Sequence, residues 1–243
     1  FYSGQQTIRE LSSLCRRYGI GYFKFNTRGH DVVSRSGKKW IGAGYERFED
    51  CIRDIQAMLR FVRRLGYTNI VLAGSSTGAN KILYYGYKTK SRGIKGLALI
   101  RPAYDLGAEL HGAGEKEWKR RVAHAKVLAK KNPRTLLVQK YGIYSPARYL
   151  SLYQYGTKED VFPYNNPKAR WKELRSVKIP VLLLIGNRDP YFLKRPRAIM
   201  EVFKQNAQSA KSFSGKIIQG ANHGFHKKEK ELAREIITWI NGL

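Results

Sequence analysis

Apolar residues recur along the chain in two alternating patterns, which predict alternating helices and strands. Steps of three and four residues predict helices over 5–18, 46–65, 78–89, 194–206 and 226–241. Short continuous apolar runs predict strands at 20–25, 70–73, 96–100, 180–185 and 215–219. Parallel strands need a crossover connection that is usually a helix, so this order indicates an α/β fold. We expect a mostly parallel sheet with helices on both faces.

Residues 105–175 interrupt the alternation. A basic amphipathic helix is predicted over about 114–131, with an apolar face of Trp118, Val122, Ala125 and Leu128. A tyrosine-rich stretch follows, over residues 141–164. We therefore expect an α/β core made of residues 1–104 and 176–243, and a helical cap of residues 105–175 inserted over the carboxyl edge of the sheet.

A turn of small residues lies where the predicted strand at 70–73 meets the following helix. Its sequence, Gly74-Ser75-Ser76-Thr77-Gly78, fits G-x-S-x-G, which at such a junction lifts the serine hydroxyl above the sheet edge. We expect both glycines to be needed because neighbouring backbone approaches too closely for a Cβ. The amides of the next helix would point at Ser76. Ser76 is the candidate nucleophile, and the alternative is a turn that only caps a helix.

A serine nucleophile needs a base, and the base needs an acid that fixes its tautomer. Asp189 and His223 each follow one of the later predicted strands, and loops at the carboxyl ends of parallel strands gather at one edge. Each has a plainer alternative, since Asp before Pro often forms a turn and His beside Gly is often a surface residue. Asp105, which follows the strand at 96–100, is the alternative acid.

The chain carries a large excess of positive charge. Its 243 residues include 46 Lys and Arg against 18 Asp and Glu, a net charge of +28. Such a surface attracts nucleic acid, anionic membranes or anionic substrates. The basic residues are spread along the chain and form no single block flanked by stacking aromatics, which disfavours nucleic acid or membrane as the main partner.

Several other classes of protein are disfavoured by the sequence. No apolar run approaches the ~20 residues that a membrane span needs. The histidines and carboxylates lack metal-ligand spacing, and the residues after Gly78 lack the spacing of a phosphate-binding loop, so we expect no metal and no cofactor. Cys15 and Cys51 form no disulfide framework, which favours a reducing, cytoplasmic location. The oligomeric state is left open.

Four segments together resemble the alpha/beta-hydrolases, of the serine esterase and lipase-like kind. They are FNTRGHD (25–31), LAGSSTGANK (72–81), LLLIGNRD (182–189) and GANHGF (220–225). The resemblance implies that Ser76 is the nucleophile, His223 the base and Asp189 the acid, and that the Thr77 N–H is one oxyanion donor. It implies a serine hydrolase that cleaves a small carboxylic ester or thioester through an acyl-enzyme. The basic, aromatic cap favours a substrate with a carboxylate or phosphate.

Two departures from the family pattern affect these expectations. Ser75 stands where relatives often have His, which changes the polarity of the pocket more than its chemistry. The family's early strands and the His-Gly loop that supplies a second oxyanion amide would precede the first helix, yet the chain opens at Phe1 directly before it. We therefore expect that roughly 25 or more N-terminal residues are absent, and that the loss of one donor lowers turnover by about 10²–10³.

Two other functions fit parts of the sequence. One is a non-catalytic protein of the same fold whose basic surface binds nucleic acid or an anionic membrane; its binding would fall steeply with salt and ignore Ser76→Ala. The other is acyl transfer, which uses the same triad and differs from hydrolysis only in its products.

Overall fold

The computed structural model describes residues 4–138, 142–166 and 168–243, so Tyr141 of the tyrosine-rich stretch lies outside it. The chain forms two compact units. The first is made of Phe1–Lys24, Arg60–Ala103 and Val161–Leu243, and the second of Phe25–Leu59 and Tyr104–Asp160. These bounds differ from those of the expected cap at 105–175, whose role as a lid stays a prediction.

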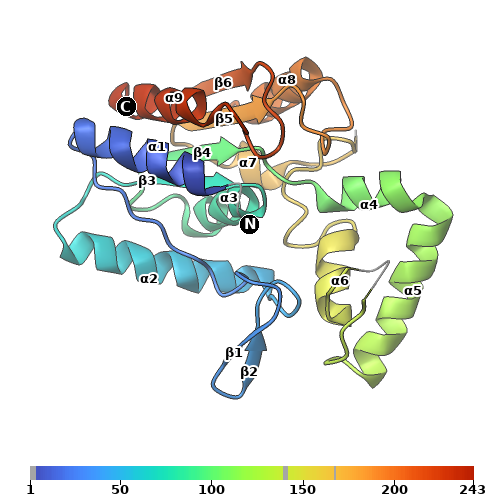
Figure 1. Ribbon diagram of the computed structural model, residues 1–243. Helices are drawn as coiled ribbons and strands as arrows, with labels where there is room; N and C mark the ends of the chain where they lie inside the picture. The colour runs from blue at the N-terminus through green and yellow to red at the C-terminus, as the bar shows by residue number, and fades with distance from the viewer. Residues whose placement is uncertain (1–3, 139–141, 167) are drawn as a thin grey trace. The chain divides into compact units, whose positions relative to one another are not determined.

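The first unit is built on a parallel sheet in the order β3-β4-β5-β6 (Figure 1). Its strands are β3 (Val71–Ser75), β4 (Gly96–Ile100), β5 (Val181–Gly186) and β6 (Phe213–Ile218). Ser75 pairs with Ile100 in register, and Gly186 pairs with Ile218. All four strands therefore end at the same edge, and the loops after β3, β5 and β6 begin there. Four of the five predicted strands are confirmed.

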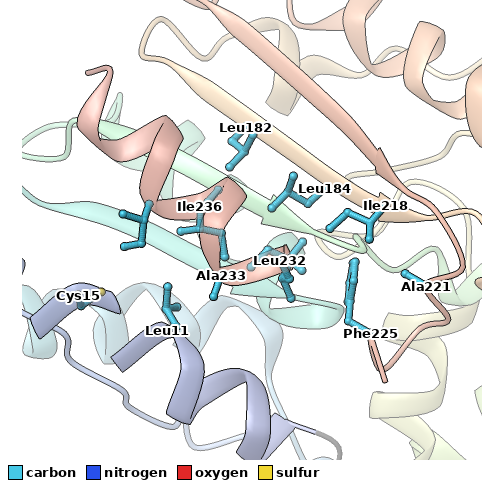
Figure 2. Packing of buried hydrophobic residues seen from close by; sticks show 13 residues of the cluster. Leu11, Cys15, Leu182, Leu184, Ile218, Ala221, Phe225, Leu232, Ala233 and Ile236 are labelled. Atoms are coloured by element: carbon cyan, nitrogen blue, oxygen red, sulfur yellow. The ribbon is translucent and has the colours of Figure 1, made fainter. Parts of the chain in front are cut away.

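Helices cover both faces of this sheet. They are α1 (Gly4–Arg17), α3 (Thr77–Thr89), α7 (Lys172–Arg175), α8 (Pro196–Asn206) and α9 (Glu229–Asn241). Figure 2 shows α1 and α9 packing on one face, with Leu11, Leu184 and Ile236 in a single buried cluster. Leu183 is also buried and points to the opposite face because side chains alternate along a strand. On that face α3 contacts β3 and β4, and α8 contacts β5 and β6.

The strand predicted at 20–25 is wrong. Within the described residues no strand pairs with this segment, and residues 20–27 have no regular secondary structure. The Ile20 N–H donates to the carbonyl of Cys15 at 2.8 Å, which holds the segment against the end of α1. Ile20 and Tyr22 pack against the core cluster of Figure 2. The apolar run thus reflects packing against this cluster and not a place in the sheet.

The second unit contains a short hairpin and a helical group. The hairpin joins β1 (Ser34–Ser36) to β2 (Lys39–Ile41), and η1 (Phe48–Asp50) precedes α2 (Cys51–Arg64), which ends in the first unit. The helical group comprises α4 (Asp105–Ala113), α5 (Glu115–Lys131) and α6 (Pro146–Tyr153). The predicted apolar face of α5 is confirmed, since Val122 and Ala125 are buried in a cluster with Tyr149, with Trp118 and Leu128 packed against it.

A buried ionic cluster lies in the second unit. Arg148 is 4 % exposed and forms two hydrogen bonds to the carboxylate of Glu159, one of them at 3.0 Å and the other shorter. It also lies 3.0 Å from a carboxylate oxygen of Glu46 and donates to the carbonyl of Ala43 at 3.2 Å. Burial, and then the charge of Glu159, raise the pKa of the nearby Asp105 to about 6.

No helix in the described part of the chain combines the length and the apolar character that a membrane crossing requires.

Candidate active site

The strand-to-helix turn puts Ser76 alone in a strained conformation. β3 ends at Ser75 and α3 begins at Thr77, and between them Ser76 has φ +55° and ψ −126°. The Ser76 N–H donates to the carbonyl of Ile100 at 2.9 Å, and the Ser76 carbonyl accepts from the Ala79 N–H at 2.9 Å. A non-glycine residue rarely adopts a positive φ, and here the ladder on one side and the helix on the other fix it. The predicted turn is confirmed.

Of the two flanking glycines, only Gly74 is required by close approach. A Cβ on Gly74 would lie 2.3 Å from the carbonyl oxygen of Gly78, nearer than any real contact. A Cβ on Gly78 would meet no atom within 4 Å. The expectation that both glycines avoid a clash is therefore wrong for Gly78, the second residue of α3, where a Cβ would point into open space. Gly74 is what allows the helix to turn back over the strand.

Asp189, His223 and Ser76 form one hydrogen-bonded chain in the first unit. His223 Nδ1 lies 2.6 Å from Asp189 Oδ2, and His223 Nε2 lies 3.3 Å from Ser76 Oγ. The Asp189 side chain is 0 % exposed and the His223 side chain 24 %. With a carboxylate at Nδ1, that nitrogen carries the proton of the neutral imidazole and donates it to Asp189. Nε2 is then left as the acceptor for the serine hydroxyl.

The loops that carry Asp189 and His223 are joined where β5 and β6 end. A Cβ on Gly186 would lie 2.3 Å from the carbonyl oxygen of Ala221, so only glycine permits this approach. The side chain of Asn187 spans the two loops, because its Oδ1 accepts from the Gly220 N–H at 2.6 Å and its Nδ2 donates to Gln219 Oε1 at 2.8 Å. These contacts fix the distance between the acid and the base.

Tyr191 completes the surroundings of the acid and the base. Its backbone N–H donates to Asp189 Oδ1 at 3.0 Å, so both oxygens of that carboxylate accept a hydrogen bond. Its ring lies edge-on to the His223 imidazole, with centroids 4.7 Å apart. The Asp189 carboxylate and the imidazole are thereby held in one orientation.

The other predicted site residues fall in different places. Thr77 is the first residue of α3, so its N–H belongs to the helix terminus beside Ser76. Asp105 begins α4 in the second unit, and the charges that act on it are those of Glu159, Arg148 and Glu46 in that unit. The carboxylate that contacts His223 is that of Asp189. Within the described residues no three His, Cys, Asp or Glu side chains gather as metal ligands would.

Sequence reasoning missed three residues of this site: Asn187, Tyr191 and Arg101. Asn187 and Tyr191 flank Asp189 in the chain, so a search of the acid's neighbours for loop-to-loop hydrogen bonds would have found them. Arg101 follows β4 and donates from Nε to Ser75 Oγ at 2.7 Å. No motif pointed to it, because its partner lies 26 positions away in the sequence.

The sequence profile of a family described as "Protein of unknown function (DUF1749)" matches residues 28–241. The chain belongs to DUF1749. No curated protein sequence matches this DUF1749 chain at a significant level.

Solved structures with the same fold cover almost all of this DUF1749 chain. A monoacylglycerol lipase from Paleococcus ferrophilus matches with a TM-score of 0.63 and 21 % identity, over 95 % of this chain and 87 % of that one. Est1E from Butyrivibrio proteoclasticus with bound ferulic acid matches with a TM-score of 0.65 and 16 % identity, over 99 % and 85 %. The esterase EaEST from Exiguobacterium antarcticum gives 0.53 and 16 %, over 97 % and 87 %. The fold of this DUF1749 chain is that of the alpha/beta-hydrolases.

Proposed function

We propose that this DUF1749 chain is a serine hydrolase that cleaves a carboxylic ester or thioester through an acyl-enzyme on Ser76. The observation that carries the proposal is the chain of hydrogen bonds from Asp189 through His223 to Ser76. The support is geometric, because a hydroxyl beside an imidazole nitrogen, with a carboxylate at the other nitrogen, is the arrangement that a nucleophile, its base and an orienting acid require. The lipase and esterases that share the fold are consistent with it.

In the proposed reaction, Ser76 Oγ attacks the ester carbonyl carbon as its proton passes to His223 Nε2. The tetrahedral intermediate then collapses, the bond to the leaving alcohol or thiol breaks, and the leaving group takes that proton. Water attacks the acyl-enzyme by the same route in reverse, which frees the acid and restores the hydroxyl. Asp189 stays ionised throughout and stabilises the imidazolium that forms twice in the cycle.

The oxyanion of each intermediate needs hydrogen-bond donors. Thr77 opens α3, and the first amides of a helix have no partner within the helix. We propose the Thr77 N–H as one donor, supported by the positive end of the helix dipole beside Ser76. A second donor is not assigned to any residue here.

The expected cap of residues 105–175 is the proposed source of substrate selectivity. Its helices α5 and α6 share a small core of their own around Tyr149. We propose that residues 105–175 act as a lid and that its tyrosines and cations favour an acyl or alcohol part with a carboxylate or phosphate. Esters of a common alcohol with neutral and anionic acids would reveal this selectivity.

The proposal is tested with p-nitrophenyl butyrate in the purified chain. We expect a burst of p-nitrophenol equal to the enzyme concentration, followed by slower turnover as the acyl-enzyme hydrolyses. Ser76→Ala should lower turnover by at least about 10⁴-fold and abolish labelling by a fluorophosphonate. Ser13→Ala, a change at an exposed serine of α1, is the control and should match wild type. Unchanged turnover and labelling in Ser76→Ala would contradict the proposal.

Hydrolysis and acyl transfer are separated by products. With butyrate esters and added glycerol or short alcohols, a hydrolase releases butyric acid in proportion to p-nitrophenol. A transferase instead forms the new ester and leaves little free acid.

A further inference from the structure

Arg101 lies at the carboxyl edge of the sheet, one position beyond β4. The residue before it, Ile100, pairs with Ser75 in register and accepts the hydrogen bond from the Ser76 N–H. Arg101 itself donates its N–H to the carbonyl of Leu184 at 2.7 Å, which continues the ladder into β5. Its backbone is therefore tied to the strand before the nucleophile and to the strand before the acid.

The Arg101 side chain contacts both of the loops that the proposed reaction must keep together. Its Nε donates to Ser75 Oγ at 2.7 Å, next to the nucleophile in the chain. Its guanidinium lies 5.9 Å from the centre of the Phe225 ring, which is 1 % exposed and follows His223 by two positions. A cation over an aromatic face is attracted by the ring, so this interaction is favourable.

The backbone around these contacts is strained in the same way at three places. Ser76 has φ +55°, Arg101 φ +42° and Phe225 φ +55°, and none of them is glycine. Such conformations persist only where surrounding contacts hold them. The contacts of the Arg101 side chain join the other two strained segments, which are far apart in sequence. Burial lowers the pKa of Arg101, and the charge of Asp189 opposes that effect by favouring the cation.

We infer that Arg101 is a positioning residue, which holds the Ser76 turn and the His223 loop at reacting distance through its hydrogen bond to Ser75 and its cation–π interaction with Phe225. This inference rests on the proposed function. Ser76 Oγ and His223 Nε2 are 3.3 Å apart, at the long end of a hydrogen bond, so a small displacement of either loop breaks the contact. Displacements of about 1 Å can cost as much as 10²-fold in rate. Arg101 touches neither Ser76 Oγ nor His223, so it acts through its neighbours.

The test measures how fast Ser76 reacts, in variants that remove one side of this contact at a time. Arg101→Ala removes the guanidinium, and Ser75→Ala removes only the hydroxyl that accepts from it. The readouts are the second-order rate constant for labelling by a fluorophosphonate and the kcat and KM for p-nitrophenyl butyrate. Lys95→Ala is the matched control, because it deletes an exposed cation just before the amino end of the same strand β4.

We expect Arg101→Ala to lower the labelling rate and kcat by about 10–100-fold, with KM within about threefold of wild type. Ser75→Ala should lower both by about 3–10-fold, and the double variant should be no slower than Arg101→Ala alone, because the two residues act through one hydrogen bond. Circular dichroism and thermal unfolding establish that each variant is folded at the assay temperature. A merely structural arginine would leave the labelling rate of the folded variant unchanged.

Where Arg101→Ala folds, either of two outcomes overturns the inference. One is a folded Arg101→Ala that is labelled at the wild-type rate, and the other is a fully additive double variant. If Arg101→Ala does not fold, Ser75→Ala still decides the matter, since wild-type labelling in that variant also overturns it. Failure of the proposed function looks different, because Ser76→Ala would then keep its activity whatever the Arg101 variants do.

Discussion

At the scale of single residues, the site depends on side chains that can form only one set of hydrogen bonds. Asp189 has both carboxylate oxygens occupied, by His223 Nδ1 and by the Tyr191 N–H. It is 0 % exposed, so water cannot replace these partners. His223 therefore has one orientation and one tautomer in which Nε2 faces Ser76 Oγ. Removing the charge of the acid should disturb chemistry far more than it disturbs the fold.

Asp189→Asn tests this and separates the two candidate acids. An amide at position 189 keeps the shape but can donate to Nδ1, which favours the tautomer with the proton on Nε2 and leaves no acceptor for Ser76. We expect kcat for p-nitrophenyl butyrate to fall by about 10³–10⁴-fold. Asp105→Asn, an equal change at the alternative acid, should stay within about twofold. The reverse order of effects would reassign the acid to Asp105.

The raised pKa of Asp105 should instead be measurable in the pH dependence of the free energy of unfolding. Its pKa is raised from 3.8 to about 6 by burial first and by Glu159 second, with Arg148 opposing and Glu46 adding to the rise. A raised pKa means that the folded state disfavours the ionised form, so this group lowers the free energy of unfolding as pH rises from about 4 to about 6. Asp105→Asn should therefore gain stability over wild type across that interval, by up to about 3 kcal/mol at pH 7. Urea unfolding at pH 4 and pH 7 measures the difference, and a difference that does not change with pH would contradict the assignment.

At the scale of elements, the turn between β3 and α3 places chemistry where the sheet ends. One residue separates the end of the strand from the start of the helix. Such a short connection is possible only where the backbone at the end of the strand passes close to the helix backbone. Gly74 provides that approach to the Gly78 carbonyl, whereas a Cβ on Gly78 itself would meet no atom within 4 Å. The two glycines of one motif therefore have different roles.

Gly74→Ala and Gly78→Ala form a matched pair. The first places a methyl group 2.3 Å from a backbone oxygen, which cannot move without shifting α3. We expect a loss of about 1–3 kcal/mol or more in the free energy of unfolding, and little remaining esterase activity. The second adds a methyl group in open space within a helix, where alanine is favoured over glycine by up to about 1 kcal/mol. Denaturant unfolding of both variants decides the case, and equal destabilisation would mean that the elbow needs both glycines.

The sequence predicted those elements whose form depends on local pattern. The runs at 96–100 and 180–185 are apolar on both faces, which only a buried parallel strand requires, and both are strands. The helix predicted over 46–65 is found as η1 and α2, and Gly66, with φ +90°, follows its last turn. The segment at 20–25 has the apolar pattern of a strand. A strand forms only where a neighbouring strand pairs with it, and the pattern of one segment does not show whether such a neighbour exists. The short helix α6 was missed because its eight residues hold too few apolar repeats to show a period.

The same distinction applies to the candidate site. Ser76, Asp189 and His223 could be found because each follows a predictable strand, and the sheet then brings the loops to one edge. Arg101 could not be found, because its role depends on side-chain contacts to Ser75 and Phe225 that no local pattern records. The unequal roles of Gly74 and Gly78 likewise follow from distances that appear only in the folded chain.

At the scale of the whole molecule, the dominant property is charge. The net charge of +28 includes exposed cations on the loop that carries the proposed acid, among them Arg188, Lys194 and Arg195. The carboxylate in that loop, Asp189, is buried and bonded to His223, so it offers little compensation at the surface. We therefore expect a positive electrostatic potential near the proposed nucleophile, which would concentrate an anionic substrate there.

Salt dependence measures this field at the site. Mono-p-nitrophenyl succinate and p-nitrophenyl butyrate share a leaving group and a four-carbon acyl chain, and differ chiefly in the terminal carboxylate. As sodium chloride rises from 20 to 500 mM, the screening length falls from about 20 Å to about 4 Å, so attraction to exposed cations fades. We expect kcat/KM for the succinate to fall by about 3–10-fold, while the butyrate stays within about twofold. Arg188→Glu together with Arg195→Glu should remove much of the response and leave the butyrate unaffected. If both esters respond alike to salt, the basic surface does not act on substrate, and selectivity must come from shape alone.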